Sequence, residues 1–137
     1  MVKKAPHPFL RDPKKQLKQA QKEAKKAAEE RSNNIFIDFI LQNTGLQLQA
    51  EYKPFPDRQH RIDFSSPELK IAVEKEGGIW RKGGGAHSRP QNIERDIYKY
   101  TRLGVEGWII IRRQPKQMKT AETLDLIKQA LKQREKQ

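Results

Sequence analysis

The sequence predicts a mixed α/β domain, of the α+β kind with a mixed sheet, whose elements follow the order α-β-β-β-α-β-α. Two short runs of alternating apolar residues, 61–64 and 71–76, follow one another closely, as in two adjacent strands. A continuous apolar run at 108–111 is typical of a strand buried on both faces. Apolar residues at helical spacing lie before, between and after these runs. A chain of 137 residues has room for one modest core.

The first core helix is expected from Asn33 onward, where the apolar residues fall on one helical stripe. Gly45 supplies its C-terminal stop. Residues 46–52 then alternate as the first strand. The helical stripe consists of Ile35, Phe36, Phe39 and Ile40.

The second and third strands are predicted to pair so that Asp63 lies opposite Glu74 and Phe64 faces Val73. Residues 67–70 make the connection. Because side chains alternate across a strand, the apolar residues share one face and the acidic residues share the other. The apolar face holds Ile62, Phe64, Ile71 and Val73, and the other holds Asp63, Glu74 and Glu76.

The second helix is expected to begin with a capping box formed by Ser88 and Gln91, after a glycine-rich loop at 77–87 that Trp80 anchors. The sequence predicts that it ends at Gly104. Its core-facing residues are expected to be Ile93, Ile97 and Tyr100.

A last helix is expected after Thr120, a good N-cap residue. Its buried stripe is predicted to consist of Leu124, Ile127 and Leu131.

Positive charge is concentrated at the N-terminus, because residues 1–31 contain ten Lys and Arg against four Asp and Glu. From residue 13 to 31 the composition favours helix, but Leu17 is the only large apolar residue. We therefore expect a solvent-exposed helical arm at 1–31 in front of a domain at 32–137. The arm would lie along DNA phosphates, or it is a solubilising extension with no specific role. The lysines expected to contact DNA are Lys14, Lys18, Lys22 and Lys25.

The bulk composition indicates the class of partner. A net charge of +12 points to a polyanion, most simply nucleic acid. The chain has no cysteine, which excludes disulfides, cysteine nucleophiles and thiolate zinc sites. It has no apolar stretch of about 18 residues and no apolar segment after its first residues. We therefore expect a cytoplasmic protein that does not enter membranes.

The acidic patch of Asp63, Glu74 and Glu76 is the strongest indication of chemistry. Three carboxylates on one patch repel one another, so the arrangement favours a bound cation. Mg²⁺, or Mn²⁺ in its place, is the natural candidate because it takes oxygen ligands. The alternative is a solvated outer face of the sheet that carries acidic residues by chance.

Several short motifs follow one another in order, at 58–64, 72–78, Trp80, 83–90, 96–100, Gly107, Trp108 and Arg112. Their order resembles that of the PD-(D/E)XK nuclease superfamily, and within it that of the small phage-type endonucleases related to very-short-patch-repair and DUF559-like proteins. The resemblance covers roughly residues 51–115. It implies a restriction-endonuclease-like αβββαβ core, magnesium-dependent cleavage of DNA and, for a phage protein, the cytoplasm of a bacterial host.

One departure from the superfamily pattern concerns Glu76, which stands where the superfamily usually has a lysine. In some branches the lysine comes from the following helix, and Lys99 would be that residue here. Lys99 would then orient the attacking water or neutralise transition-state charge. The alternative for Lys99 is a surface ion pair with Asp96, three residues earlier on the same helical face.

A loop histidine, His87, lies directly before the expected second helix, which suits phosphate binding or proton transfer. In the resembling proteins such a histidine belongs to the active site. Arg89 is expected to contact phosphate, and Arg58 and Arg61 are weaker candidates for DNA contacts.

The function predicted from these observations is a metal-dependent DNA endonuclease that hydrolyses phosphodiester bonds. Asp63, Glu74 and Glu76 would hold the ion, while Lys99 and His87 would assist water activation or leaving-group protonation. If both DNA strands are cut, a homodimer is expected. The alternative is a non-catalytic nucleic-acid-binding protein on a decayed nuclease fold. An RNA-binding protein of ribosomal type also fits the charge, but it does not explain the clustered acidic residues.

Overall fold

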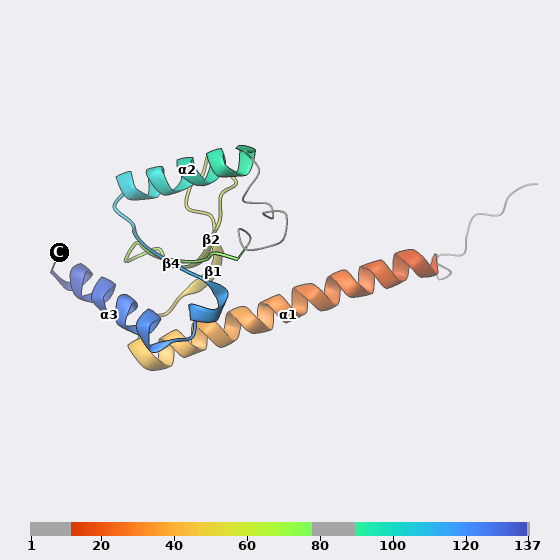
Figure 1. The fold of residues 1–137 in the computed structure, drawn as a ribbon, viewed down its shortest axis with the longest axis horizontal. Helices are drawn as coiled ribbons and strands as arrows, with labels where there is room; N and C mark the ends of the chain where they lie inside the picture. The colour runs from red at the N-terminus through yellow and green to blue at the C-terminus, as the bar shows by residue number, and fades with distance from the viewer. Residues whose placement is uncertain (1–11, 78–89, 137) are drawn as a thin grey trace, which may run out of the picture. The chain divides into compact units, whose positions relative to one another are not determined.

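A computed structural model describes residues 12–77 and 90–136 of the chain (Figure 1). The predicted α+β class and order of elements are confirmed, with three helices, four strands and one short 3₁₀ helix in the described residues. Contacts divide the chain into two units, residues 1–35 and 36–137. The elements are α1 (Pro13–Thr44), β1 (Gln49–Tyr52), β2 (Ile62–Ser66), β3 (Ile71–Lys75), α2 (Pro90–Val105), β4 (Ile109–Arg113), η3 (Pro115–Gln117) and α3 (Ala121–Glu135).

The four strands form one mixed sheet in the order β1-β2-β3-β4. The first three strands pair antiparallel, and β4 joins β3 in parallel after the crossover through α2. Phe64 pairs with Val73, so the predicted register is confirmed. The tight connection places Lys70 in the left-handed region, with φ 52°.

Helices cover both faces of the sheet within residues 36–137 (Figure 1). The C-terminal end of α1 and the helix α3 pack on one face around Ile40, Val73 and Ile127. The other face packs against α2 around Phe55, Ala72 and Leu103. Thr120 caps α3 by accepting a hydrogen bond from the Thr123 amide, as predicted. The predicted stripe of α3 is also confirmed, since Ile127 is buried and Leu124 and Leu131 pack beside it.

The prediction that Ile62 shares a face with Phe64 is wrong. Ile62 packs in the cluster beneath α2, whereas Phe64 packs in the cluster on the opposite face. The pairing strand shows the same change, because Ala50 lies on the Phe64 side and Tyr52 on the Ile62 side. Between them Glu51 has φ 54°, a left-handed conformation that interrupts the simple alternation of a strand. Asp63 lies opposite this interruption.

The predicted orientation of α2 is also wrong. Ile93 and Ile97 are 44% and 61% exposed, whereas Lys99 is only 7% exposed and Leu103 is fully buried. The helix is turned so that part of its polar side faces the sheet. The reason is electrostatic: a buried carboxylate on β3 requires a cation, and Lys99 supplies it.

The helix α2 ends at Val105 and is closed by Gly107 instead of Gly104. Gly107 has φ 86° and donates its amide to Gly104, while the Trp108 amide bonds to the Leu103 carbonyl. This pair of bonds is a Schellman motif, which requires a left-handed residue.

The arm and the first core helix, expected as two segments, form the single helix α1. Its first part is largely exposed, and its buried residues are Phe36 and Ile40 near the C-terminal end. Ile35 was predicted in the stripe but is exposed, because it lies away from the sheet-facing side. Gly45 stops the helix as predicted, with φ 78° and its amide bonded to the Leu41 carbonyl. None of the described helices has the length and apolar character needed to cross a membrane.

Two glycine substitutions at the end of α2 should have opposite effects on stability. A Cβ at Gly104 or at Gly107 would meet no atom within 4 Å, so only the backbone decides the outcome. Gly107→Ala should destabilise by about 1 kcal/mol because alanine disfavours a positive φ. Gly104→Ala should stabilise by about 0.5 kcal/mol because alanine favours helix over glycine. Urea unfolding of both variants tests this, and shifts of the same sign would contradict it.

Candidate active site

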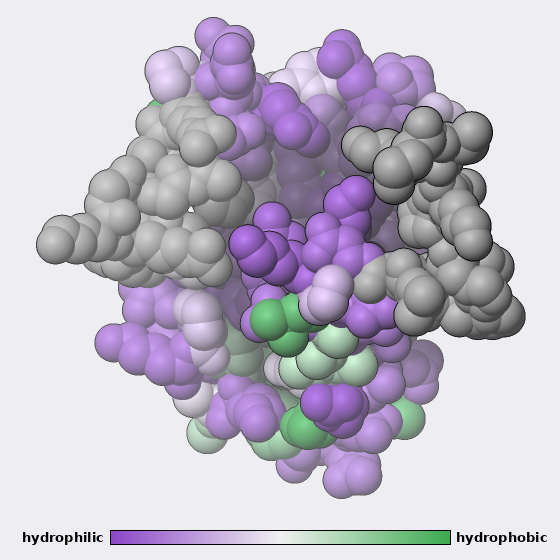
Figure 2. Space-filling view, turned by 90° about the vertical axis from the view of Figure 1, so that its right-hand side faces the viewer, coloured by the Kyte–Doolittle hydropathy of each residue, from purple (hydrophilic) through white to green (hydrophobic). Residues whose placement is uncertain are grey.

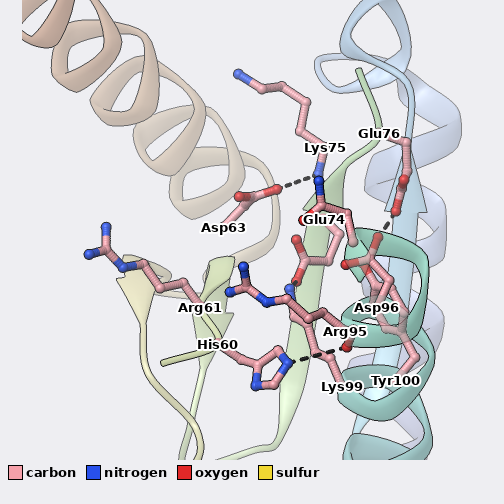
Figure 3. A pocket seen from close by; sticks show the side chains of 11 residues that line it. His60, Arg61, Asp63, Glu74, Lys75, Glu76, Arg95, Asp96, Lys99 and Tyr100 are labelled. Carbon is pink, nitrogen blue, oxygen red and sulfur yellow. Dashed lines mark hydrogen bonds and ion pairs between the residues drawn. The ribbon is translucent and has the colours of Figure 1, made fainter. Parts of the chain in front are cut away.

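A cavity of about 300 Å³ lies between the β2–β3 part of the sheet and the helix α2 (Figure 3). It is formed entirely within residues 36–137. All of its lining residues are polar or charged, and the charged groups are of both signs. The lining residues are His60, Arg61, Asp63, Glu74, Lys75, Glu76, Asn92, Arg95, Asp96, Lys99 and Tyr100.

Two carboxylates from neighbouring strands, Asp63 and Glu74, form one side of the cavity. Asp63 accepts a hydrogen bond of 2.8 Å from the Lys75 amide to Oδ2, which fixes its orientation (Figure 3). Glu74 is 4% exposed. Burial, followed by the negative charge of Asp63, raises the pKa of Glu74 to about 8 although Lys99 opposes the shift. The Glu74 site therefore favours either a proton or a cation.

Lys99 of α2 reaches Glu74, with Nζ 2.5 Å from Oε1. Both side chains are buried, so the pair interacts in a poorly hydrated environment where charges attract strongly. Oε1 makes this ion pair but no hydrogen bond of regular geometry within the described residues. Lys99 thus forms an ion pair with a buried carboxylate of the sheet, and not only the surface pair with Asp96 that was the alternative prediction.

The third predicted metal ligand, Glu76, is held by a guanidinium and a phenol hydroxyl. Its Oε1 accepts a hydrogen bond of 2.6 Å from Arg112 Nε and one of 3.3 Å from the Tyr100 hydroxyl. In Figure 3 it lies at the opposite end of the cavity from His60. Within the part of the chain that the structure describes, no three His, Asp or Glu side chains are grouped closely enough to hold a metal ion.

Tyr100 lies between the two cationic side chains at this end of the cavity. Its ring centroid is 5.3 Å from Lys99 Nζ and 4.2 Å from Arg112 Cζ. Burial, with the negative charges of Glu74 and Glu76, raises the pKa of the Tyr100 phenol, so the hydroxyl remains a hydrogen-bond donor. Tyr100 was predicted as a core residue, and its ring does pack beside Leu103 in the cluster beneath α2.

His60 lines the cavity, and the sequence reasoning did not select it. Its ring stacks on Tyr98, and Nε2 lies 3.2 Å from the Arg95 carbonyl, which binds the β1–β2 connection to α2. Burial lowers the pKa of His60 below its ordinary value, so the ring is neutral at about pH 7. The available signal was its position three residues before Asp63, but the polar run around it has no periodicity.

The remaining predicted residues lie apart from the carboxylate pair or outside the described residues. Arg61 lines the cavity and lies 4.0 Å from Glu51, while Arg58 stacks 4.4 Å above the Tyr98 ring. His87 and Arg89 lie outside the described residues, as do Ser88 of the expected capping box and the glycine-rich loop from residue 78 onward. The predicted lysines of the arm, Lys14, Lys18, Lys22 and Lys25, are exposed on α1.

Comparisons of the chain with protein-family models, curated proteins and solved structures find no match.

The raised pKa of Glu74 predicts how stability depends on pH. The folded protein holds the proton more tightly than the unfolded chain, where the pKa is near 4.5, so the free energy of unfolding should fall as pH rises from about 5 to about 8. Glu74→Gln cannot titrate and should lose this part of the slope. Melting temperatures in EDTA measure it, and parallel curves for the two proteins would contradict the assignment.

Proposed function

We propose that this protein is a metal-dependent endonuclease that hydrolyses phosphodiester bonds in DNA. The observation that carries the proposal is the convergence of Asp63, Glu74 and Lys99 in one cavity. Two carboxylates and an ammonium are the groups expected from the resemblance to the PD-(D/E)XK superfamily. The antiparallel β1-β2-β3 strands, followed by α2 and the parallel β4, accord with a restriction-endonuclease-like core.

The carboxylate pair suits Mg²⁺ or Mn²⁺. Glu74 is a buried acid beside a second acid, so its negative charge is unfavourable without a compensating positive charge. A metal cation can supply that positive charge in place of a proton. Mg²⁺ commonly uses one or two carboxylates and completes its shell with water and substrate phosphate oxygens. Asp63 and Glu74 would hold the ion without Glu76. When bound, it would supply Lewis acidity toward the phosphoryl group and favour ionisation of a nearby water.

Lys99 would act on the phosphoryl group from the α2 side of the cavity. During hydrolysis the water oxygen bonds to phosphorus, the ester P–O bond breaks, the water loses a proton and the leaving oxygen gains one. Negative charge grows on the phosphoryl oxygens during this exchange. An ammonium held by a buried carboxylate is already in place to offset that charge, so no side chain needs to be ordered during the reaction.

DNA is the substrate that the charge distribution favours. The whole chain carries a net charge of +12, and the face drawn in Figure 2 is mainly hydrophilic. Four of the lysines on α1, at spacings of four, four and three residues, lie on one side of the helix. Phosphate contacts of this kind supply affinity without selecting a sequence. A homodimer would bring two of the proposed catalytic cavities to the two strands of a DNA duplex.

A non-catalytic nucleic-acid-binding protein is the second candidate. The observation that favours it is that Lys99 already neutralises Glu74, as in a purely structural ion pair. The two candidates differ in whether the cavity supports turnover.

Cleavage of supercoiled plasmid with Mg²⁺ or Mn²⁺ distinguishes these functions. Asp63→Ala and Lys99→Met should each reduce the rate by about 10²-fold or more. The first removes a ligand of the metal ion, and the second removes a positive charge that offsets the negative charge growing on the phosphoryl oxygens. Lys128→Gln, an exposed change on α3, is the matched control and should cleave as the wild type does. Equal rates in all four proteins, or no cleavage with either metal, would reject the nuclease.

The role of the arm is tested without catalysis, by binding to duplex DNA in EDTA over a range of salt concentrations. Replacing its four predicted lysines by glutamine should flatten the salt dependence by about 0.9 log unit for each lysine that binds a phosphate. A control with the same change of charge replaces four exposed lysines elsewhere, and an equal effect of both would show that the arm makes no specific contact. The arm set is Lys14, Lys18, Lys22 and Lys25, and the control set is Lys116, Lys119, Lys128 and Lys132.

A further inference from the structure

The position where the resembling nucleases have a lysine is occupied here by Glu76, which holds an arginine from the next strand. Arg112 Nε donates to Glu76 Oε1 over 2.6 Å. The guanidinium also lies over the Tyr100 ring, with its Cζ 4.2 Å from the ring centroid. Two independent contacts therefore fix this guanidinium.

The sheet brings Arg112 close to the proposed reaction centre. In the parallel pairing of β3 with β4, Arg112 is the partner of Glu74 itself. The Glu76 amide continues this pairing with a bond of 2.7 Å to the Arg113 carbonyl. Lys99 approaches the same tyrosine ring, so two cations border Tyr100.

The outer edge of the guanidinium remains available. The side chain of Arg112 is 50% exposed, whereas that of Glu76 is only 17% exposed. Within residues 12–77 and 90–136, the two Nη nitrogens of Arg112 have no hydrogen-bond partner. A planar fork with its two terminal nitrogens available is the geometry that binds a phosphate with two parallel hydrogen bonds.

We propose that Arg112 binds a phosphate of the nucleic-acid backbone beside the Asp63–Glu74 centre, and that Glu76 is a positioning residue for it. This inference rests on the proposed function, which it deepens by naming a further substrate contact. It also gives Glu76 a role other than that of a metal ligand. Arg112 of β4 would then act beside Lys99, and Glu76 would direct it.

Two binding measurements on the full chain test the assignment, both without turnover. The first is the affinity for short duplex DNA in EDTA, and the second is the affinity for Mn²⁺ alone. The variants are Arg112→Gln, Arg112→Lys and Glu76→Gln. Lys128→Gln serves as a control with the same loss of one positive charge on an exposed helix, and circular dichroism checks that each variant folds.

Arg112→Gln should weaken DNA binding about tenfold and reduce the salt slope by about 0.9, because one cation no longer binds a phosphate. Arg112→Lys should keep the salt slope of the wild type but only part of its affinity for DNA, because an ammonium cannot donate the two parallel hydrogen bonds of a guanidinium. Glu76→Gln should weaken DNA binding about threefold, since the guanidinium remains but is no longer held. All three variants should keep the Mn²⁺ affinity of the wild type.

A loss of Mn²⁺ affinity in Glu76→Gln with unchanged DNA binding would make Glu76 a metal ligand and overturn the proposal. An effect of Arg112→Gln no larger than that of Lys128→Gln would also overturn it. These failures differ from failure of the proposed function. If the wild type binds DNA through Arg112 but does not cleave plasmid, the proposed nuclease activity is contradicted and the proposed phosphate contact is retained.

Discussion

The buried carboxylate of Glu74 is the constraint on which the rest of the site depends. A charge taken from water into a sheet is costly unless a partner accompanies it, and Lys99 is that partner. To deliver Lys99, the helix α2 turns a polar side toward the sheet and leaves Ile93 and Ile97 exposed. Leu103, one turn further along, then fills the core beneath the helix. The Lys99–Glu74 ion pair thus determines both the charge of the cavity and the way helix α2 packs on the sheet.

Two carboxylates that line the cavity are each paired with a cation, and this pairing explains how so many charges are tolerated. Lys99 lies against Glu74, and Arg112 lies against Glu76, with the Tyr100 ring between the two cations. Each of these two carboxylates therefore fixes one cation. Asp63 is oriented by a main-chain amide instead, which leaves it the carboxylate most suited to a metal ion.

Much of the fold follows from local patterns in the sequence. The register of Phe64 with Val73, the stop at Gly45 and the cap at Thr120 each depend on residues close in the chain, so periodicity and turn chemistry suffice to predict them. The orientation of α2 was mispredicted because the apolar spacing of its isoleucines was weighed without the distant carboxylate that attracts Lys99. His60 was not selected, and Arg112 was named among the motifs without a role, because their roles arise only from contacts with α2 and β3.

The central claim is that Asp63 and Glu74 together bind a divalent cation at a phosphodiesterase centre. Anomalous diffraction from crystals soaked with Mn²⁺ tests it most directly, because the scattering locates the ion without reference to activity. We predict one peak within coordination distance of both carboxylates, about 2.0–2.2 Å from the nearest oxygens, and no peak at Glu76. A peak at Glu76 alone, or none near Asp63 and Glu74 at saturating Mn²⁺, would contradict the account.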